Sequence, residues 1–156
     1  MTAVAGSVAQ AVRILIAAGG PLEWPANAGW PLHQAVAEFR TELDLEVEPV
    51  PEAGLGRAVP GLEHAVMELG RLGVLHLRDE GFVAWWTVDL HEMPSLRREL
   101  MRCDPDAARW HYRAARRWAA LAATSAKSLR SATVSSTALP RSARPVRLHA
   151  VASTRR

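Results

Sequence analysis

The chain has 156 residues, a single cysteine and a formal net charge of +3. One cysteine excludes an intrachain disulfide and is typical of a reducing compartment, so we expect a cytoplasmic protein. No apolar stretch approaches the roughly 20 uncharged residues that span a bilayer, and residues 1–20 lack the basic start of a signal peptide. The length fits one domain with a hydrophobic core and some remainder.

The first predicted helix begins after Ser7, which together with Gln10 has the form of a capping box. It ends at a Gly-Gly-Pro stop signal, and residues 22–29, which contain proline, asparagine and glycine, predict a loop. A second helix is predicted over residues 31–43, because a proline suits its first position and apolar residues then recur at helical spacing.

An acidic stretch follows this second helix. Leu43, Leu45 and Val47 alternate with acidic residues, which predicts a short edge strand with an acidic outer face. Residues 49–60 hold three prolines and two glycines, so we expect a loop there with at most one or two helical turns at 53–59.

The most consistent local signals lie in the middle of the chain. An amphipathic helix is predicted from Leu62 to Leu72, because its apolar residues form one stripe, and Gly73 ends it. The runs 74–78 and 82–90 flank a short turn that contains glycine, and apolar residues alternate along the second run. This pattern predicts a two-stranded hairpin with one face toward the core.

The junction between this helix and the hairpin reads Leu-x-x-Leu-Gly-Val-Leu. It resembles the third helix and wing of winged helix-turn-helix domains, over about residues 61–90. The resemblance implies a helix that enters the DNA major groove and a wing that touches the backbone or the minor groove. Here, however, the helix carries Glu63 and Glu68, and the turn carries Asp79 and Glu80. Neither element is basic, so their contact with DNA phosphates would be opposed.

Two more helices are predicted after the hairpin. Pro94 opens the first, with apolar residues on one side and arginines around the rest. Asp104 then caps a helix that runs to about Lys127. Residues 128–156 are rich in serine, threonine and alanine, contain two prolines and scatter arginines, so a basic disordered tail is predicted.

The predicted fold is therefore mainly α with a small antiparallel hairpin or three-stranded sheet, an α+β, winged-helix-like domain at residues 6–127. Charge divides the chain differently. Residues 1–92 hold five basic and thirteen acidic residues, a balance of −8, whereas residues 93–156 hold fourteen and three, a balance of +11. The basic part either meets an anionic partner or folds against the acidic part, and the sequence leaves both open.

The strongest candidate site is a stripe of arginines on the last predicted helix. Arg109, Arg113 and Arg116 are spaced i, i+4 and i+7 and so share one helical face. Arginine matches phosphate with paired donors and stacks on bases, which favours nucleic acid. The alternative is that these arginines are solvated or pair with acidic residues of the same molecule or a second copy. The candidate nucleic-acid contacts are Arg97, Arg98, Arg109, Arg113, Arg116, Arg117 and Lys127.

The tryptophans are expected mainly in the core, since Trp86, Trp110 and Trp118 fall on predicted apolar faces. Trp85 points to the other side of its strand. Either a second packed layer covers it or it is an exposed anchor for a protein contact.

No pattern predicts catalysis. His91-Glu92, with or without Cys103 and His111, matches no zinc spacing, and the chain has no glycine-rich phosphate loop and no nucleophile elbow. We therefore expect no cofactor, metal or small-molecule substrate, and a non-enzymatic regulator that binds DNA through the basic helix and tail. The alternative is a protein–protein adaptor or oligomeric assembly protein with no nucleic-acid role.

Overall fold

The computed structural model describes the backbone of residues 7–53 and 56–153 and the side chains of those residues as far as Leu129. The chain divides into two units, residues 1–123 and 124–156. The first unit contains the hydrophobic core, and all packing described below lies within it. Within the described residues the elements are helices and short antiparallel strands, which confirms the predicted α+β class.

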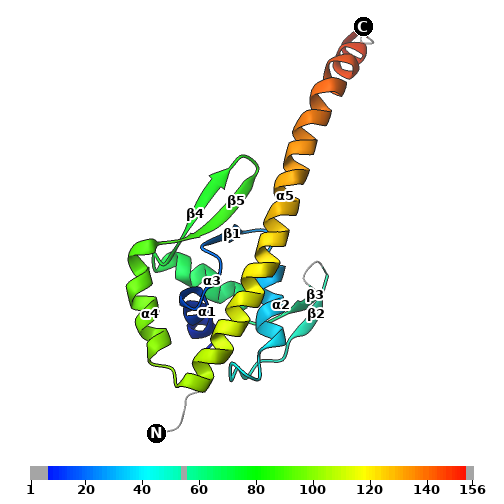
Figure 1. The fold of residues 1–156 in the computed structure, drawn as a ribbon. Coiled ribbons are helices and arrows are strands. Elements are labelled where there is room, and N and C mark those ends of the chain that lie inside the picture. Colours follow the sequence, from blue (N-terminus) through cyan, green and yellow to red (C-terminus); the bar gives the residue numbers. More distant parts are fainter. Residues whose placement is uncertain (1–6, 54–55, 154–156) are drawn as a thin grey trace. The chain divides into compact units, whose positions relative to one another are not determined.

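The sheet has the strand order β1-β5-β4, and all its pairings are antiparallel (Figure 1). The predicted hairpin is confirmed as β4 (Leu75–Glu80) and β5 (Val83–Val88). Its turn was predicted at residues 79–81 but consists of Gly81 and Phe82, and Gly81 has a φ of 67°. Phe82 is therefore 94% exposed at the tip instead of facing the core.

The third strand is β1 (Glu23–Pro25), in a segment predicted to be a loop. Trp24 pairs with Trp86, and the Val88 N–H donates to the Leu22 carbonyl at 2.9 Å. A proline is tolerated here because the strand lies at the sheet edge. The prediction of a strand over residues 43–47 is wrong.

Residues 39–44 form turns and residues 45–48 have no regular secondary structure, in place of the predicted helix end and strand. The helix α2 (Trp30–Glu38) ends five residues before the predicted end. Leu43 and Leu45 are both buried, and Asp44 between them has a φ of 57°, a left-handed conformation that aspartate tolerates better than most residues. The alternation of apolar and acidic residues thus arises from a tight turn that buries both leucines.

A second, two-stranded hairpin connects α2 to the next helix. It consists of β2 (Val50–Glu52) and β3 (Gly56–Ala58), where a loop with at most one or two helical turns at 53–59 was predicted. Buried His33 of α2 holds the hairpin, because its Nδ1 accepts from the Val59 N–H at 2.9 Å while its Nε2 lies 2.9 Å from Glu63.

Three predicted helices are confirmed by α1 (Val8–Ala17), α3 (Leu62–Arg71) and α4 (Met93–Met101). Ser7 caps α1 as expected, since its hydroxyl accepts from the Gln10 N–H at 3.0 Å. A short 3-10 turn, η1 (Leu90–Glu92), precedes α4. The helix α1 packs against both α3 and α4, and its inner residues are fully buried (Figure 1).

The helix α5 (Pro105–Ser153) begins where predicted, and Asp104 caps it by accepting from the Ala107 N–H at 2.9 Å. Trp118 is completely buried and meets Trp24 edge to face with ring centroids 4.9 Å apart. The helix passes its predicted end near Lys127, since residues 128–139 contain neither glycine nor proline to stop it. Side chains of residues 130–156 lie outside the described residues, and the disordered tail stays a prediction.

Candidate binding surfaces

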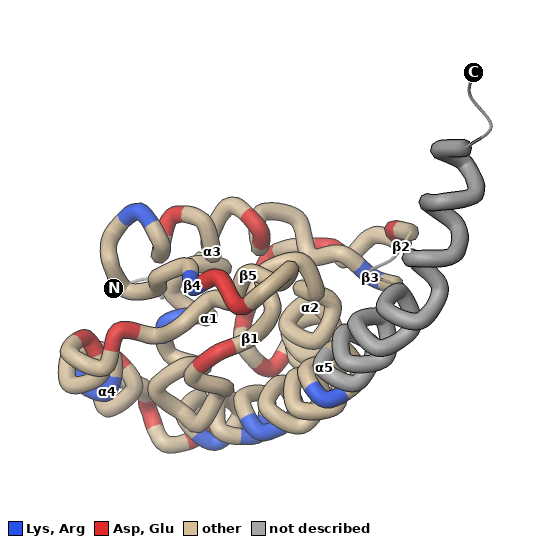
Figure 2. Tube along the Cα trace, turned by 90° about the horizontal axis from the view of Figure 1, so that it is seen from above, with Lys and Arg blue, Asp and Glu red and all other residues tan. Residues whose placement is uncertain are grey.

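The first candidate surface is the outward side of α5, here called the α5 outer face and formed by Arg109, Tyr112, Arg113 and Arg116. These positions repeat at three- and four-residue intervals and are all exposed. Figure 2 shows Lys and Arg spaced along this helix, while acidic residues lie over the other elements and at the start of α5. The predicted arginine stripe is thus brought together on one helical face.

Two of the four arginines in the predicted stripe bind carboxylates of the same molecule. Arg117 donates through Nε to Glu38 of α2 at 3.0 Å, and this hydrogen bond is the main reason that the pKa of Glu38 lies below its ordinary value. Arg109 donates to Asp106 at 2.8 Å, one turn earlier on its own helix. Arg117 is therefore turned from the α5 outer face toward α2, and only part of the stripe is left for an external anion.

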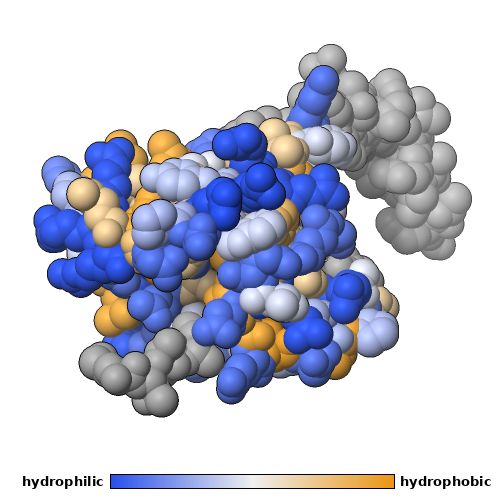
Figure 3. All heavy atoms as spheres, turned by 60° about the horizontal axis from the view of Figure 1, so that its bottom comes forward, coloured by the Kyte–Doolittle hydropathy of each residue, from blue (hydrophilic) through white to orange (hydrophobic). Residues whose placement is uncertain are grey.

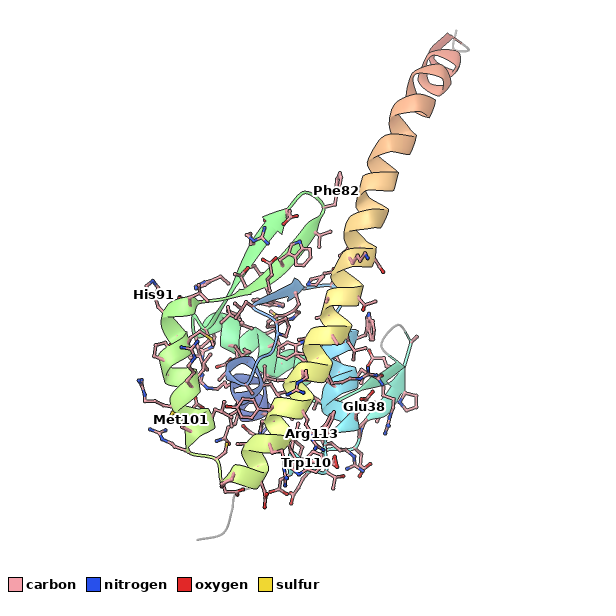
Figure 4. All side chains as sticks on the ribbon, in the orientation of Figure 1. Glu38, Phe82, His91, Met101, Trp110 and Arg113 are labelled. Carbon is pink, nitrogen blue, oxygen red and sulfur yellow. The ribbon has the colours of Figure 1, made fainter. Side chains whose placement is uncertain are left out.

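Arg113 is held by aromatic packing. Its guanidinium carbon lies 5.0 Å from the centroid of the Trp110 ring, and Trp110 is itself half-buried with Phe39 at a centroid distance of 6.3 Å (Figure 4). Such a cation–π contact fixes the direction of the guanidinium without neutralising its charge. Arg116 is exposed and has no ion-pair partner among the described residues. These two arginines are the ones most available to a phosphate.

The remaining predicted contacts are dispersed. Arg97 and Arg98 are exposed on α4, and neither has an ion-pair partner in the described part of the chain. Lys127 is exposed in the second unit, for which no position relative to the first is assigned. Most of the molecular face in Figure 3 is hydrophilic, with separated apolar patches. The basic residues therefore form one row on α5 with additional charges elsewhere.

Trp85 is only 2% exposed, so the alternative of an exposed protein-contact anchor is wrong. The alternation of the strand does not predict this, because residues on both faces of β5 are buried.

Tyr112, which is 46% exposed on the α5 outer face, was missed by the sequence reasoning. Its spacing of three residues from Arg109 and four from Arg116 was the signal that could have found it.

The second surface is a groove between α3 and β4, with a volume of about 510 Å³. Trp86 forms part of its lining from β5, and Met67 and Leu77 are 61% and 58% exposed at its sides. Glu68 and Arg71 line it and form an ion pair with each other, which leaves no net charge on that pair. The sequence analysis did not predict this groove, because the groove depends on how α3 lies over the sheet. Its full lining is His64, Met67, Glu68, Gly70, Arg71, Leu75, His76, Leu77 and Trp86.

The side chains considered for a metal site have structural surroundings. Burial raises the pKa of the Cys103 thiol, whose Sγ lies 3.7 Å from the Glu99 carbonyl. His111 is buried with Nδ1 2.8 Å from the Ala107 carbonyl, and burial lowers its pKa. Within the described residues, no three His, Cys, Asp or Glu side chains gather as metal ligands would. The helices there also include none that is both long and apolar enough to cross a bilayer.

Comparisons with known proteins give no assignment: the chain matches no protein-family model, no curated protein and no solved structure. The function of the chain is therefore inferred from the two surfaces.

Proposed function

We propose that the protein is a non-enzymatic, winged-helix-like module that binds DNA through the α5 outer face, as a cytoplasmic regulator of transcription. The observation that carries this proposal is the row of exposed cations on α5, in which Arg113 and Arg116 have no carboxylate partner among the described residues. The basic residues that follow on the chain, Lys127 and the arginines of the predicted tail, add charge of the same sign.

The winged-helix-like part of the proposal is supported by the arrangement of α3 and the sheet. The helix α3 leads directly into the β4–β5 hairpin, and β5 pairs with a third short strand, as winged helices commonly do. Against the usual mode of DNA binding, α3 carries Glu63 and Glu68, and Asp79 and Glu80 lie at the end of β4. Phosphate would be repelled by both elements, so the proposed DNA contact lies on α5 instead.

The shape and chemistry of the α5 outer face suit a duplex. The major groove of B-DNA admits an α-helix, and arginine donates to phosphates and to guanine edges. Tyr112 lies between the arginines and is 46% exposed, so its ring is accessible to a sugar or base edge. Trp110 holds Arg113 in place, which reduces the conformational entropy that this side chain loses on binding.

A salt titration of binding to duplex DNA tests the proposal. The wild-type chain is expected to bind at low salt, with a log affinity that falls linearly against log salt concentration. The double variant Arg113→Ala/Arg116→Ala removes two cations and should reduce the slope by about 1.8, since each phosphate contact contributes about 0.9. Arg57→Ala/Arg71→Ala is the matched control, because it removes two exposed arginines from other elements. Absence of low-salt binding, or equal slopes in the two double variants, would overturn the proposal.

The second candidate function is a protein adaptor with no nucleic-acid role. The specific observation in its favour is the α3–β4 groove, which has exposed apolar side chains along its sides. A helix that reads DNA would need cations at these positions instead. Apolar surface of this kind marks protein contacts more often than nucleic-acid contacts. Light scattering without DNA, at low and high salt, tests whether the protein also assembles with itself. A salt-resistant oligomer favours the adaptor, and a monomer that binds DNA favours the regulator.

A further inference from the structure

We propose that the α3–β4 groove binds an extended segment of a partner protein, which adds as a strand to the free edge of β4 and carries an apolar residue and a basic residue two positions apart. The inference is independent of DNA binding by α5, and it specifies the partner class of the adaptor candidate. It follows from the position of β4 in the sheet, the face that the groove exposes and the charge at its end.

The edge of β4 supplies backbone hydrogen-bonding groups. Within the described residues β4 pairs only with β5, because the strand order is β1-β5-β4 (Figure 1). An edge strand of six residues presents unpaired N–H and C=O groups along its outer side. An added strand satisfies these groups in the same way as a strand of the sheet itself. The opposite edge, β1, has only three residues and includes a proline, so it is a poorer template.

The groove receives the side chains of such a strand. Leu75 and Leu77 lie on the same face of β4 as Trp86, since Leu77 pairs directly with Trp86 across the hairpin. Leu75 and Trp86 are buried beneath α3, whereas Leu77 is 58% exposed and Met67 of α3 is 61% exposed beside the same groove. An apolar side chain from an added strand would cover Leu77 and Met67 together, which are otherwise left in water.

A carboxylate on the same face decides the charge of the partner. Asp79 follows Leu77 by two positions on the exposed end of β4, and it has no ion-pair partner among the described residues. The neighbouring acidic residue, Glu80, is bound by Arg78 at 2.8 Å. A lysine or arginine in the partner, two residues from the apolar side chain over Leu77, would lie opposite Asp79. Nucleic acid does not fit this edge because its phosphates would face the same carboxylate.

A second copy of this chain fits the edge less well. If two β4 strands pair antiparallel about Leu77, His76 faces the Arg78 of the other copy, and Leu75 faces its Asp79. If they pair about Arg78, the two arginines face each other directly. The register about Arg78 places like charges directly opposite, which destabilises a strand pair, and the register about Leu77 places apolar Leu75 against the Asp79 carboxylate without a cation. A partner that places an apolar residue against Leu77 and a cation against Asp79 avoids these conflicts.

The experiment uses the full chain and fluorescein-labelled peptides of seven residues in which threonine alternates with valine. One valine near either end is replaced by lysine, because the strand direction decides which end meets Asp79. Fluorescence anisotropy is expected to show saturable binding of one lysine peptide. Leu77→Asp should weaken it by about tenfold, and a proline in the centre of the peptide should weaken it similarly by removing a ladder N–H. Phe82→Ser is the matched control, since this exposed apolar residue lies at the hairpin tip outside the groove (Figure 4).

A charge exchange separates a specific site from non-specific stickiness. Asp79→Lys should lose affinity for the lysine peptide and gain affinity for the same peptide with glutamate in that position. Circular dichroism checks that each variant is folded. Absence of saturable binding, or equal losses in Leu77→Asp and Phe82→Ser, would overturn the proposal. So would an oligomer in light scattering that Leu77→Asp converts to a monomer, because a second copy would then occupy the edge. DNA binding should be unchanged by Leu77→Asp, so the two proposals can fail separately.

Discussion

The α5 outer face and the α3–β4 groove differ in almost every property that decides what a surface binds. The first is a convex helical row of cations with one tyrosine, and two of its arginines have no carboxylate partner among the described residues. The second is a concave surface with apolar sides, an internally neutralised ion pair and an exposed strand edge. In a winged-helix-like fold the second surface would be expected to read DNA. Our two proposals divide the roles differently, with polyanion contact on α5 and protein contact at the hairpin.

The largest expected loss of stability comes from a substitution on the inner side of α5, because this side anchors the helix and therefore its outer face. Trp118 is completely buried and its ring packs against Trp24. A side chain at Gly20 would lie 2.7 Å from the Trp118 ring, so the surroundings fit this residue closely. Trp118→Ala should lower the free energy of unfolding by about 3–5 kcal/mol. Urea denaturation measures this value.

Arg116→Ala is the control for Trp118→Ala. Arg116 lies on the outer side of the same helix, so its substitution should change the free energy of unfolding by less than about 0.5 kcal/mol. A loss of similar size in both variants would contradict the division of α5 into a packed inner side and a free outer face.

The next effect concerns the packing of α3 on the sheet, which shapes the groove. Gly70 lies against Trp86, and a Cβ at this position would be 2.9 Å from the indole ring. Gly70→Val should therefore lower the free energy of unfolding by about 1–3 kcal/mol through overpacking. Thermal or urea unfolding measures the loss. Met67→Ala on the exposed side of α3 should cost less than about 0.5 kcal/mol. A neutral Gly70→Val variant would show that the helix shifts easily over the sheet.

The elements that the sequence predicted correctly are those with complete local signals. The helix α1 has a serine cap and a glycine stop, and α3 with its hairpin has clear periodicities and a glycine at each boundary. The strand β1 has three residues and a proline, and it exists only because β5 pairs with it. The apolar alternation at Leu43 and Leu45 imitates a strand, but a left-handed Asp44 turns the chain so that both leucines are buried.

The candidate site was predictable to a similar extent. Helical spacing alone placed Arg109, Arg113 and Arg116 on one face. It did not show that Arg117 binds Glu38, a residue 79 positions earlier, because the packing of α2 beside α5 decides that contact. The groove was not predictable for the same reason, since α3 and β4 form it only when the helix crosses the sheet.

A smaller effect on stability is expected from the titration of His111, which lies on the inner side of α5. Burial lowers the pKa of His111 below its ordinary value of 6.5, so the folded protein binds fewer protons than the unfolded chain as the pH falls through that value. Stability contributed by neutral His111 is therefore present above pH 6.5 and is lost below it, by at most about 1.4 kcal/mol per pH unit. Urea unfolding at pH 8, 6 and 5 should show this fall. His111→Gln should flatten the profile, and an unchanged profile would contradict the assignment.

The smallest expected effect is a change in the salt dependence of DNA binding, and it tests whether Glu38 reduces the number of arginines available on α5. Glu38→Gln removes the carboxylate that binds Arg117, so this guanidinium becomes available to a phosphate. The slope of log affinity for duplex DNA against log salt concentration should steepen by about 0.9, the contribution of one phosphate contact. Glu46→Gln is the matched control, because it removes an exposed carboxylate that has no ion-pair partner among the described residues.

Stability should change little in Glu38→Gln, since an exposed ion pair contributes only about 0–1 kcal/mol. If both substitutions steepen the slope equally, the effect is one of net charge and Arg117 does not join the DNA contact. If only Glu38→Gln steepens it, and Arg117→Ala in that background removes the gain, the acidic part of the chain restrains DNA binding through this one contact. The opposite charges of residues 1–92 and 93–156 then have a direct consequence: the protein neutralises one edge of its basic helix and leaves the other for an external anion.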